Sequence, residues 1–161
     1  MTQQQSKAPR RQTIEQERGR QAWKDIQSVK SIAKDYRPIA RGLTAMIQIN
    51  GLGQTLGFFY AKSKNDKGQP DKEKAHYQIL NHLTNWMKWM RDEKYFSATN
   101  AEKIGNEYYG LLSWVLDKDT SSSDYRRATT ECLAFGRWLA RFTEAELAEA
   151  EGTTEGKGDG Q

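Results

Sequence analysis

Residues 125–142 have the sequence YRRATTECLAFGRWLARF, in which apolar side chains recur at every third or fourth position. Because an α-helix completes a turn in 3.6 residues, this spacing places the apolar side chains on one side of a helix. They are Ala128, Cys132, Phe135, Leu139 and Phe142. The pattern predicts an amphipathic helix that runs to about Ala150.

Five apolar stripes with helical spacing precede this segment, in residues 22–36, 39–47, 52–60, 79–90 and 104–115. No segment alternates between apolar and polar residues for long enough to predict a strand. The sequence therefore predicts an all-α fold, a compact antiparallel bundle of five to six helices.

Local signals predict where helices begin and break. Thr13 with Gln16 and Thr99 with Glu102 have the spacing of capping boxes, which we expect to start the first and fifth helices. Pro38 lacks an amide donor and disfavours helical geometry in the residue before it. We therefore expect the first helix to break or kink at Pro38.

Connections are predicted in three places. The pair Asn50-Gly51 readily takes a left-handed cap and is expected to end the second helix. Residues 62–74 are charged and contain a glycine and a proline, which predicts a loop. Residues 117–124 predict a turn in which serines are candidate caps for the last helix.

The chain of 161 residues is long enough for one domain. We expect a disordered basic arm in residues 1–12, a helical bundle in residues 13–150 and a disordered glycine-rich acidic tail in residues 151–161. The sequence has no run of 18 apolar residues to span a membrane. Its single cysteine cannot form an internal disulfide, which favours the reducing cytoplasm.

Charge is distributed unevenly along the chain. Residues 1–41 contain ten Lys and Arg against four Asp and Glu, whereas residues 143–161 contain one against six. Such a gradient indicates either a polyanionic partner for the basic part or head-to-tail contact between copies. A merely solvated basic surface is also compatible with it.

No residue pattern indicates catalysis. His76 and His82 are six positions apart and fall roughly opposite one another on a helix, so they cannot share a metal ion through one face. The sequence contains no P-loop, dinucleotide-binding or nucleophile-elbow motif. Its carboxylates are explained by solvated helix surface. We therefore expect no catalytic residue, metal, cofactor or small-molecule substrate.

Two groups of basic residues are candidate RNA-binding surfaces. If the first helix continues through the proline, Lys30, Lys34, Arg37 and Arg41 share one face, with Trp23 on the same side. Like charges at this spacing repel one another, so their stacking favours an anionic partner such as a phosphate backbone. An ordinary solvated face is the alternative.

The second group lies on the last helix, where Arg126, Arg137 and Arg141 share a face with Thr130. Guanidinium groups bind phosphate through two parallel hydrogen bonds. Alternatively, Arg137 and Arg141 pair with Glu144 and Glu149 of the same or a neighbouring helix.

Tryptophan is frequent, and the cluster Trp86, Met87, Trp89 and Met90 surrounds too much of one helix for a single buried face. Core packing explains most of these side chains, and the remainder favours contact with another protein. Candidate residues for base stacking or for an interface are Trp23, Trp86 and Trp89.

Three segments together resemble a known family. They are NGLGQTLGF in residues 50–58, YRRATTECLAFGRWLARFTEAEL in residues 125–147 and ERGRQA in residues 17–22. In this order and spacing they resemble the small subunit of the type III-B CRISPR RNA-targeting (Cmr) complex, over most of residues 15–148. The chain departs from the family pattern at Thr44, where proline is frequent, and at Gly136, which interrupts an apolar pair.

The resemblance implies a non-catalytic subunit of a ribonucleoprotein complex in antiviral defence. Its copies would stack as a filament beside other Cmr subunits, lining the channel that holds guide RNA and target RNA, while other subunits cleave. It implies no membrane partner. The alternative function is a structural helical adaptor that contacts only protein.

Overall fold

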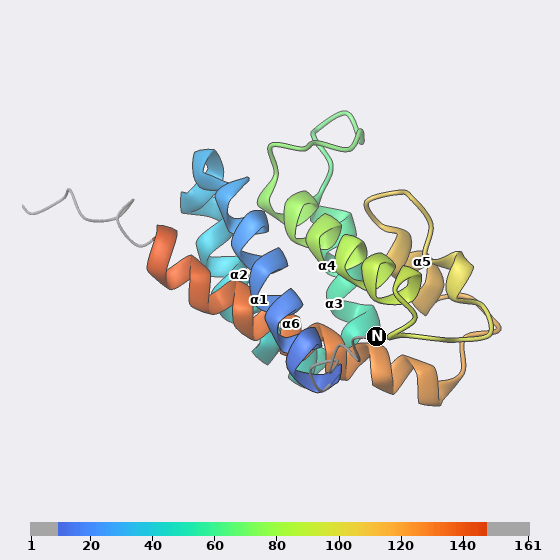
Figure 1. Cartoon of the computed structure of the whole chain (residues 1–161). Helices are drawn as coiled ribbons and strands as arrows, with labels where there is room; N and C mark the ends of the chain where they lie inside the picture. The colour runs from blue at the N-terminus through green and yellow to red at the C-terminus, as the bar shows by residue number, and fades with distance from the viewer. Residues whose placement is uncertain (1–9, 148–161) are drawn as a thin grey trace, which may run out of the picture.

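The chain folds as a bundle of α-helices (Figure 1). This structure is a computed structural model, which describes residues 10–147 and their side chains from Thr13 onward. Its elements are α1 (Arg10–Gln27), η1 (Lys30–Ile32), α2 (Ala33–Asn50), α3 (Leu52–Lys62), α4 (Ala75–Asp92), η2 (Ala101–Lys103), α5 (Gly110–Val115) and α6 (Ser122–Leu147). In this part of the chain the one β contact is an isolated bridge between Lys64 and Pro70. The predicted all-α bundle is confirmed.

The long helix α6 packs against both α1 and α2 (Figure 1). Gly136 of α6 permits the close approach of α2, since a Cβ at this position would lie 3.2 Å from Leu43 Cδ2 and 3.4 Å from Thr44 Cγ2. The two residues that depart from the family pattern, Thr44 and Gly136, therefore meet at one helix crossing.

The core lies where α4 faces α6. Trp86 is fully buried, and its ring stacks between Phe135 of α6 and Trp89 of α4, with both ring centroids 5.0 Å away. Tyr95 extends the stack beyond Trp89. Large apolar side chains of α2 and α3 complete the core, among them Tyr36, Leu43, Ile47, Leu56 and Phe59.

The break predicted at Pro38 is wrong, because α2 continues through this residue. The chain turns earlier, where the Ser28 hydroxyl donates a hydrogen bond to the carbonyl of Asp25 (2.6 Å) and helix α1 ends. Pro38 removes one helical hydrogen bond, to the carbonyl of Lys34. Both residues are exposed, so water can solvate the carbonyl and the helix persists.

The predicted cap at Thr13 is also wrong, since α1 already begins at Arg10. Arginine and glutamine are good helix formers, which explains the additional turn. Helix α1 therefore begins three residues earlier than predicted. The rest of the predicted disordered arm, the end of the last helix beyond Leu147 and the predicted acidic tail lie outside the described residues.

The fifth helix is shorter than predicted. Residues 99–109 form turns and the short η2, and α5 begins only at Gly110, without a capping box at Thr99. Tertiary contacts explain the difference. The Thr84 hydroxyl of α4 donates a hydrogen bond to the carbonyl of Tyr108 (2.9 Å) and accepts one from the amide of Leu111 (3.3 Å), which holds this segment against α4.

The other predicted connections are confirmed. Helix α2 ends at Gly51 as predicted, where the Gly51 amide donates to the carbonyl of Ile47 (2.8 Å), but the φ of 82° and ψ of 161° at Gly51, which glycine adopts without strain, differ from the expected left-handed cap. A loop joins α3 to α4, and Ser121 caps α6 by accepting a hydrogen bond from the amide of Asp124 (3.1 Å). None of the described helices combines the length and the apolar character that a membrane span requires.

Candidate nucleic-acid interface

The first basic group lies on η1 and α2 and faces the end of α6. Arg41 Nε lies 2.6 Å from Glu144 Oε1, and Arg37 Nη2 lies 4.0 Å from Glu144 Oε2. Lys30 Nζ lies 3.6 Å from Glu146 Oε2. The acidic end of α6 therefore partly neutralises the basic group within one chain, and head-to-tail contact between copies is not needed to explain the charge gradient.

Exposure differs sharply within this group. The side chain of Arg37 is 11% exposed, whereas those of Lys30 and Arg41 are each 52% exposed. Lys34 is also exposed. Arg37 is therefore the member least accessible to a partner, whereas Lys30 and Arg41 both lie on the surface beside α6.

The second basic group joins the first at a shallow hollow between α2 and α6. This hollow has a volume of about 480 Å³, and its lining residues are Arg41, Thr44, Arg137, Ala140, Arg141 and Glu144. Arg137 and Arg141 are exposed, and neither has an ion-pair partner among the described residues. The predicted pairing of these two arginines with Glu144 is wrong, since that carboxylate binds Arg41 of α2 instead. The alternative pairing with Glu149 lies outside the described residues.

Arg137 and Arg141 also border a second, smaller hollow on the α1 side of α6, next to Glu15 and Trp138. The two arginines therefore stand between two depressions of the surface. Two adjacent guanidinium groups on one helix face can contact successive phosphates of a strand lying along α6. We call this surface, formed by Arg41, Arg137 and Arg141, the arginine surface.

Aromatic rings lie beside the arginine surface, in the contact between α1 and α6. Trp23 is 42% exposed and meets the ring of Phe142 edge-on, with centroids 5.4 Å apart. Trp138 stacks on the same Phe142 ring, also with centroids 5.4 Å apart. Partly exposed rings beside cations are the arrangement with which proteins hold single-stranded nucleic acid.

Besides Lys30, Lys34 and Arg37, three further candidate residues do not join this surface. Arg126 lies in a separate depression near the start of α6, with Arg127 and Thr130. Trp86 is 1% exposed, so its interpretation as a stacking residue for a partner is wrong; its flat ring fills the core. Trp89 is half-buried in the same ring stack.

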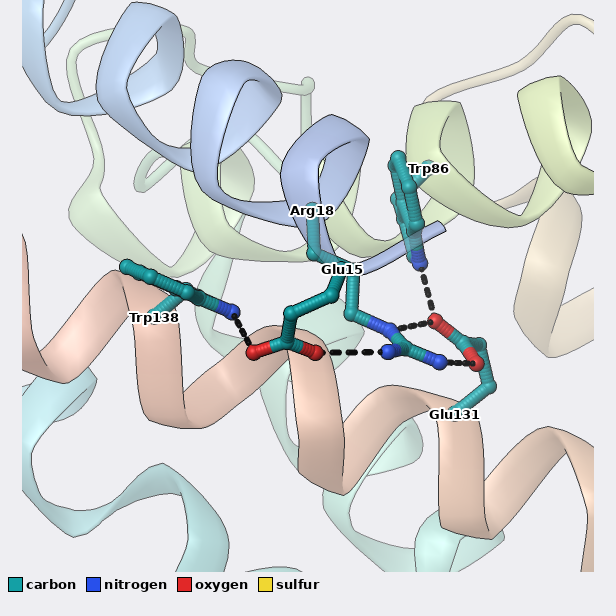
Figure 2. A network of polar contacts seen from close by, with 5 residues as sticks. All are labelled: Glu15, Arg18, Trp86, Glu131 and Trp138. Atoms are coloured by element: carbon teal, nitrogen blue, oxygen red, sulfur yellow. Dashed lines mark hydrogen bonds and ion pairs between the residues drawn. The ribbon is translucent and has the colours of Figure 1, made fainter. Parts of the chain in front are cut away.

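A polar network connects α1, α4 and α6 behind the arginine surface (Figure 2). Arg18 donates two hydrogen bonds of 2.8 Å to the two carboxylate oxygens of Glu131, and the Trp86 indole donates a third to Glu131 Oε1 (2.8 Å). Arg18 also donates to Glu15 (2.9 Å), whose other oxygen accepts from the Trp138 indole (3.1 Å). The network holds the helix that carries Arg137 and Arg141 in register with α1.

Sequence reasoning missed this network. Glu131 falls on the apolar side of α6, between Ala128 and Phe135, and this placement is the signal that could have identified it as a buried charge. A buried carboxylate requires a partner, and an arginine on a neighbouring helix supplies one.

Two titratable side chains are buried away from this network, Asp25 near the C-terminal end of α1 and His82 on α4. Burial raises the pKa of Asp25 to about 7, although the amide of Gln21 donates to its Oδ1 (2.9 Å). Its Oδ2 has no hydrogen-bond partner among the described residues. Burial lowers the pKa of His82 to about 3, and Nδ1 of this ring lies 2.8 Å from the Tyr36 hydroxyl. Both groups are buried, and neither lines the hollows beside the arginine surface.

The two histidines occupy separate environments. His82 is buried beside Tyr36, whereas His76 packs against the rings of Phe58 and Phe59. Burial lowers the pKa of His76, and the nearby Lys62 lowers it further. The described residues contain no group of three or more His, Cys, Asp or Glu side chains placed to bind a metal ion.

Most of the chain matches the sequence model of one known protein family. Residues 14–146 match the model of a family described as CRISPR-associated protein (Cas_Cmr5). The matched range includes the arginine surface, the aromatic rings beside it and the network behind it.

Proposed function

Because the chain belongs to the Cas_Cmr5 family, that of the small subunit of the type III-B CRISPR Cmr complex, we propose that its arginine surface lines the path of RNA in that complex. The family membership makes the chain a structural subunit that associates with other Cmr subunits. The RNA contact is our proposal. In it the chain acts in the cytoplasm, and cleavage of the target belongs to other subunits.

The observation that carries the proposal is the convergence of Arg41, Arg137 and Arg141 from two helices on one hollow. All three are exposed. Cations on a rigid helical scaffold bind phosphates without regard to base sequence, which a guide-directed complex requires of a subunit that meets many targets. Trp23 is close enough to α6 to offer a ring to an unstacked base.

A second surface supports the proposed stacking of copies. Residues 42–61, at the end of α2 and through α3, contain no charged side chain, although 29% of the whole chain is charged. Ile49 is 79% exposed and Phe58 is 42% exposed in this stretch. A segment without charged side chains that exposes apolar residues is typical of the centre of a protein interface, and Lys62, whose Nζ lies 5.9 Å from the centre of the Phe58 ring, marks its border. This face is therefore suited to a neighbouring protein subunit and the arginine surface to RNA.

The experiment is a salt series of RNA binding by the full chain. Affinity for a single-stranded RNA falls with salt because bound cations displace condensed counterions, with a slope of roughly 0.7 per neutralised phosphate. Arg137→Ala together with Arg141→Ala should weaken binding at low salt about tenfold or more and reduce the slope by about 1.4.

The matched control is Lys72→Ala together with Lys74→Ala, which removes two exposed charges from the loop before α4. This variant should leave the slope unchanged. The proposal is rejected if both double variants weaken binding equally, since only net charge would then matter.

The structural adaptor that contacts only protein is the second candidate function. The ion pairs of Lys30, Arg37 and Arg41 with the acidic end of α6 favour it, because they reduce the charge available to RNA. Under this function neither double variant would change RNA binding by the assembled complex.

A further inference from the structure

Glu144 is placed at the edge of the hollow that the arginine surface forms. Its Oε1 lies 2.6 Å from Arg41 Nε, and its Oε2 lies 4.0 Å from Arg37 Nη2. Arg137 and Arg141 line the same hollow without an ion-pair partner among the described residues. One carboxylate thus occupies one guanidinium of the arginine surface and leaves the other two accessible.

A carboxylate and a phosphodiester are chemically similar ligands for arginine. Each carries one negative charge, and each accepts two parallel hydrogen bonds from a guanidinium group. Arg41 cannot satisfy both with the same donors. A phosphate that enters the hollow therefore competes with Glu144 for Arg41.

The exposure of the pair makes this exchange feasible. Both side chains, Arg41 and Glu144, are about half exposed, at 52% and 49%, and such pairs contribute little net stability in water. The pair of Arg18 with Glu131 is the opposite case within the same chain, since its side chains are only 17% and 10% exposed. An anion from solvent can displace the first carboxylate, whereas the second is enclosed by three helices.

We infer that Glu144 is a built-in competitor of RNA, which holds Arg41 until a phosphate of the strand displaces it. This inference rests on the proposed function of the arginine surface and adds its regulation. The competitor weakens binding of stray RNA by the isolated chain. A strand that the rest of the complex already holds along α6 has the high local concentration needed to displace it.

The test measures binding of a fluorescently labelled oligouridine of fixed length to variants of the full chain in which one carboxylate is replaced by an uncharged amide, by anisotropy across a salt series. Glu144→Gln should bind three- to tenfold more tightly than the wild type at low salt. Its salt dependence should be steeper by about 0.7, because one more phosphate is neutralised by Arg41.

The matched control is Glu107→Gln, since Glu107 is exposed in the connection before α5, away from the hollow, and the substitution changes the net charge equally. It should leave the slope of the wild type unchanged. In the double variant Arg41→Ala with Glu144→Gln, the gain should vanish, because the freed guanidinium is absent.

The outcomes separate the inference from the proposed function. If removing Arg137 and Arg141 weakens binding but Glu144→Gln behaves as Glu107→Gln does, the arginine surface stands and the competitor is rejected. If neither the wild type nor any variant binds the oligonucleotide, both are rejected. Tighter and more salt-dependent binding by Glu144→Gln alone supports the inference.

Discussion

Arg18 and Glu131 are 113 positions apart in the sequence and form a two-pronged ion pair, with Nε to Oε1 and Nη2 to Oε2 both at 2.8 Å (Figure 2). Trp86 donates its indole proton to the same carboxylate (2.8 Å). One glutamate of α6 is thereby bound to α1 and to α4. Because α6 also carries Arg137 and Arg141, this pair fixes where the arginine surface lies on the bundle.

Removing the cation of this pair should destabilise the fold. Arg18→Met keeps most of the side-chain volume but leaves the Glu131 carboxylate, 10% exposed, without its charged partner. We expect the free energy of unfolding to fall by about 3 kcal/mol or more, measured by urea denaturation. Arg20→Met is the control, since Arg20 pairs with Glu17 on the exposed side of α1 and should change stability by less than about 1 kcal/mol. Equal effects of the two variants would contradict the role of the network.

The buried carboxyl of Asp25 should make stability fall as pH rises from about 4 to 7. Its pKa is raised to about 7 by burial, so the folded state holds the proton more tightly than the unfolded chain does. His82→Asn removes the opposing histidine and exposes this trend. In that variant the free energy of unfolding should decrease with pH across this range, by at most about 1.4 kcal/mol per pH unit.

The buried ring of His82 should act in the opposite direction. Its pKa is lowered to about 3 by burial, so the unfolded chain binds a proton that the folded state excludes between pH 3 and 6.5. In Asp25→Asn the free energy of unfolding should therefore rise with pH up to about 6.5 and then level off. The wild type should show a flatter profile than either variant in thermal melts between pH 4 and 6.5. Identical profiles for the three proteins would contradict both assignments.

Gly110 should not tolerate a side chain. A Cβ at this position would overlap the carbonyl oxygen of Gly105, which is backbone and cannot swing away. Gly110→Ala should lower the free energy of unfolding by about 2 kcal/mol or more. Gly105→Ala is the control, because a Cβ there meets nothing within 4 Å. A Gly110→Ala variant that melts with the wild type would show that this connection is not packed as described.

Cys132 should be inert in the folded protein. It is fully buried, and burial raises the pKa of its thiol. A thiol-specific chromogenic disulfide should react with it only on the timescale of unfolding, and rapidly in denaturant. Fast reaction under native conditions would mean that α6 opens locally.

The fold class was predictable because apolar residues recur with helical period in every long segment. The end of α2 was predictable for a similarly local reason, since Gly51 adopts a positive φ that its residue type suggests. The break at Pro38 and the helix starting at Thr99 were predicted wrongly. In both cases long-range packing outweighs the local signal: Tyr36 is anchored to His82, and Tyr108 is anchored to Thr84.

The candidate interface was predictable only in its composition. The sequence indicates which cations share a helix face, and it cannot indicate that Glu144 faces Arg41 rather than Arg141 of its own helix. The same limit applies to Trp86, whose burial depends on how α4 meets α6. Which side chains pair between two helices depends on the angle and position at which the helices cross. A local sequence pattern does not contain this information.

The proposal that RNA follows the arginine surface is tested most directly by photo-crosslinking in the assembled Cmr complex. A target RNA carrying 4-thiouridine is irradiated in the complex, and labelled peptides of this chain are identified by mass spectrometry. We expect labels on residues 134–142 of α6 or on Trp23 beside them, and their loss when Arg137 and Arg141 are replaced by alanine. Labels confined to the uncharged face of residues 42–61, or none on this chain, would contradict the proposal.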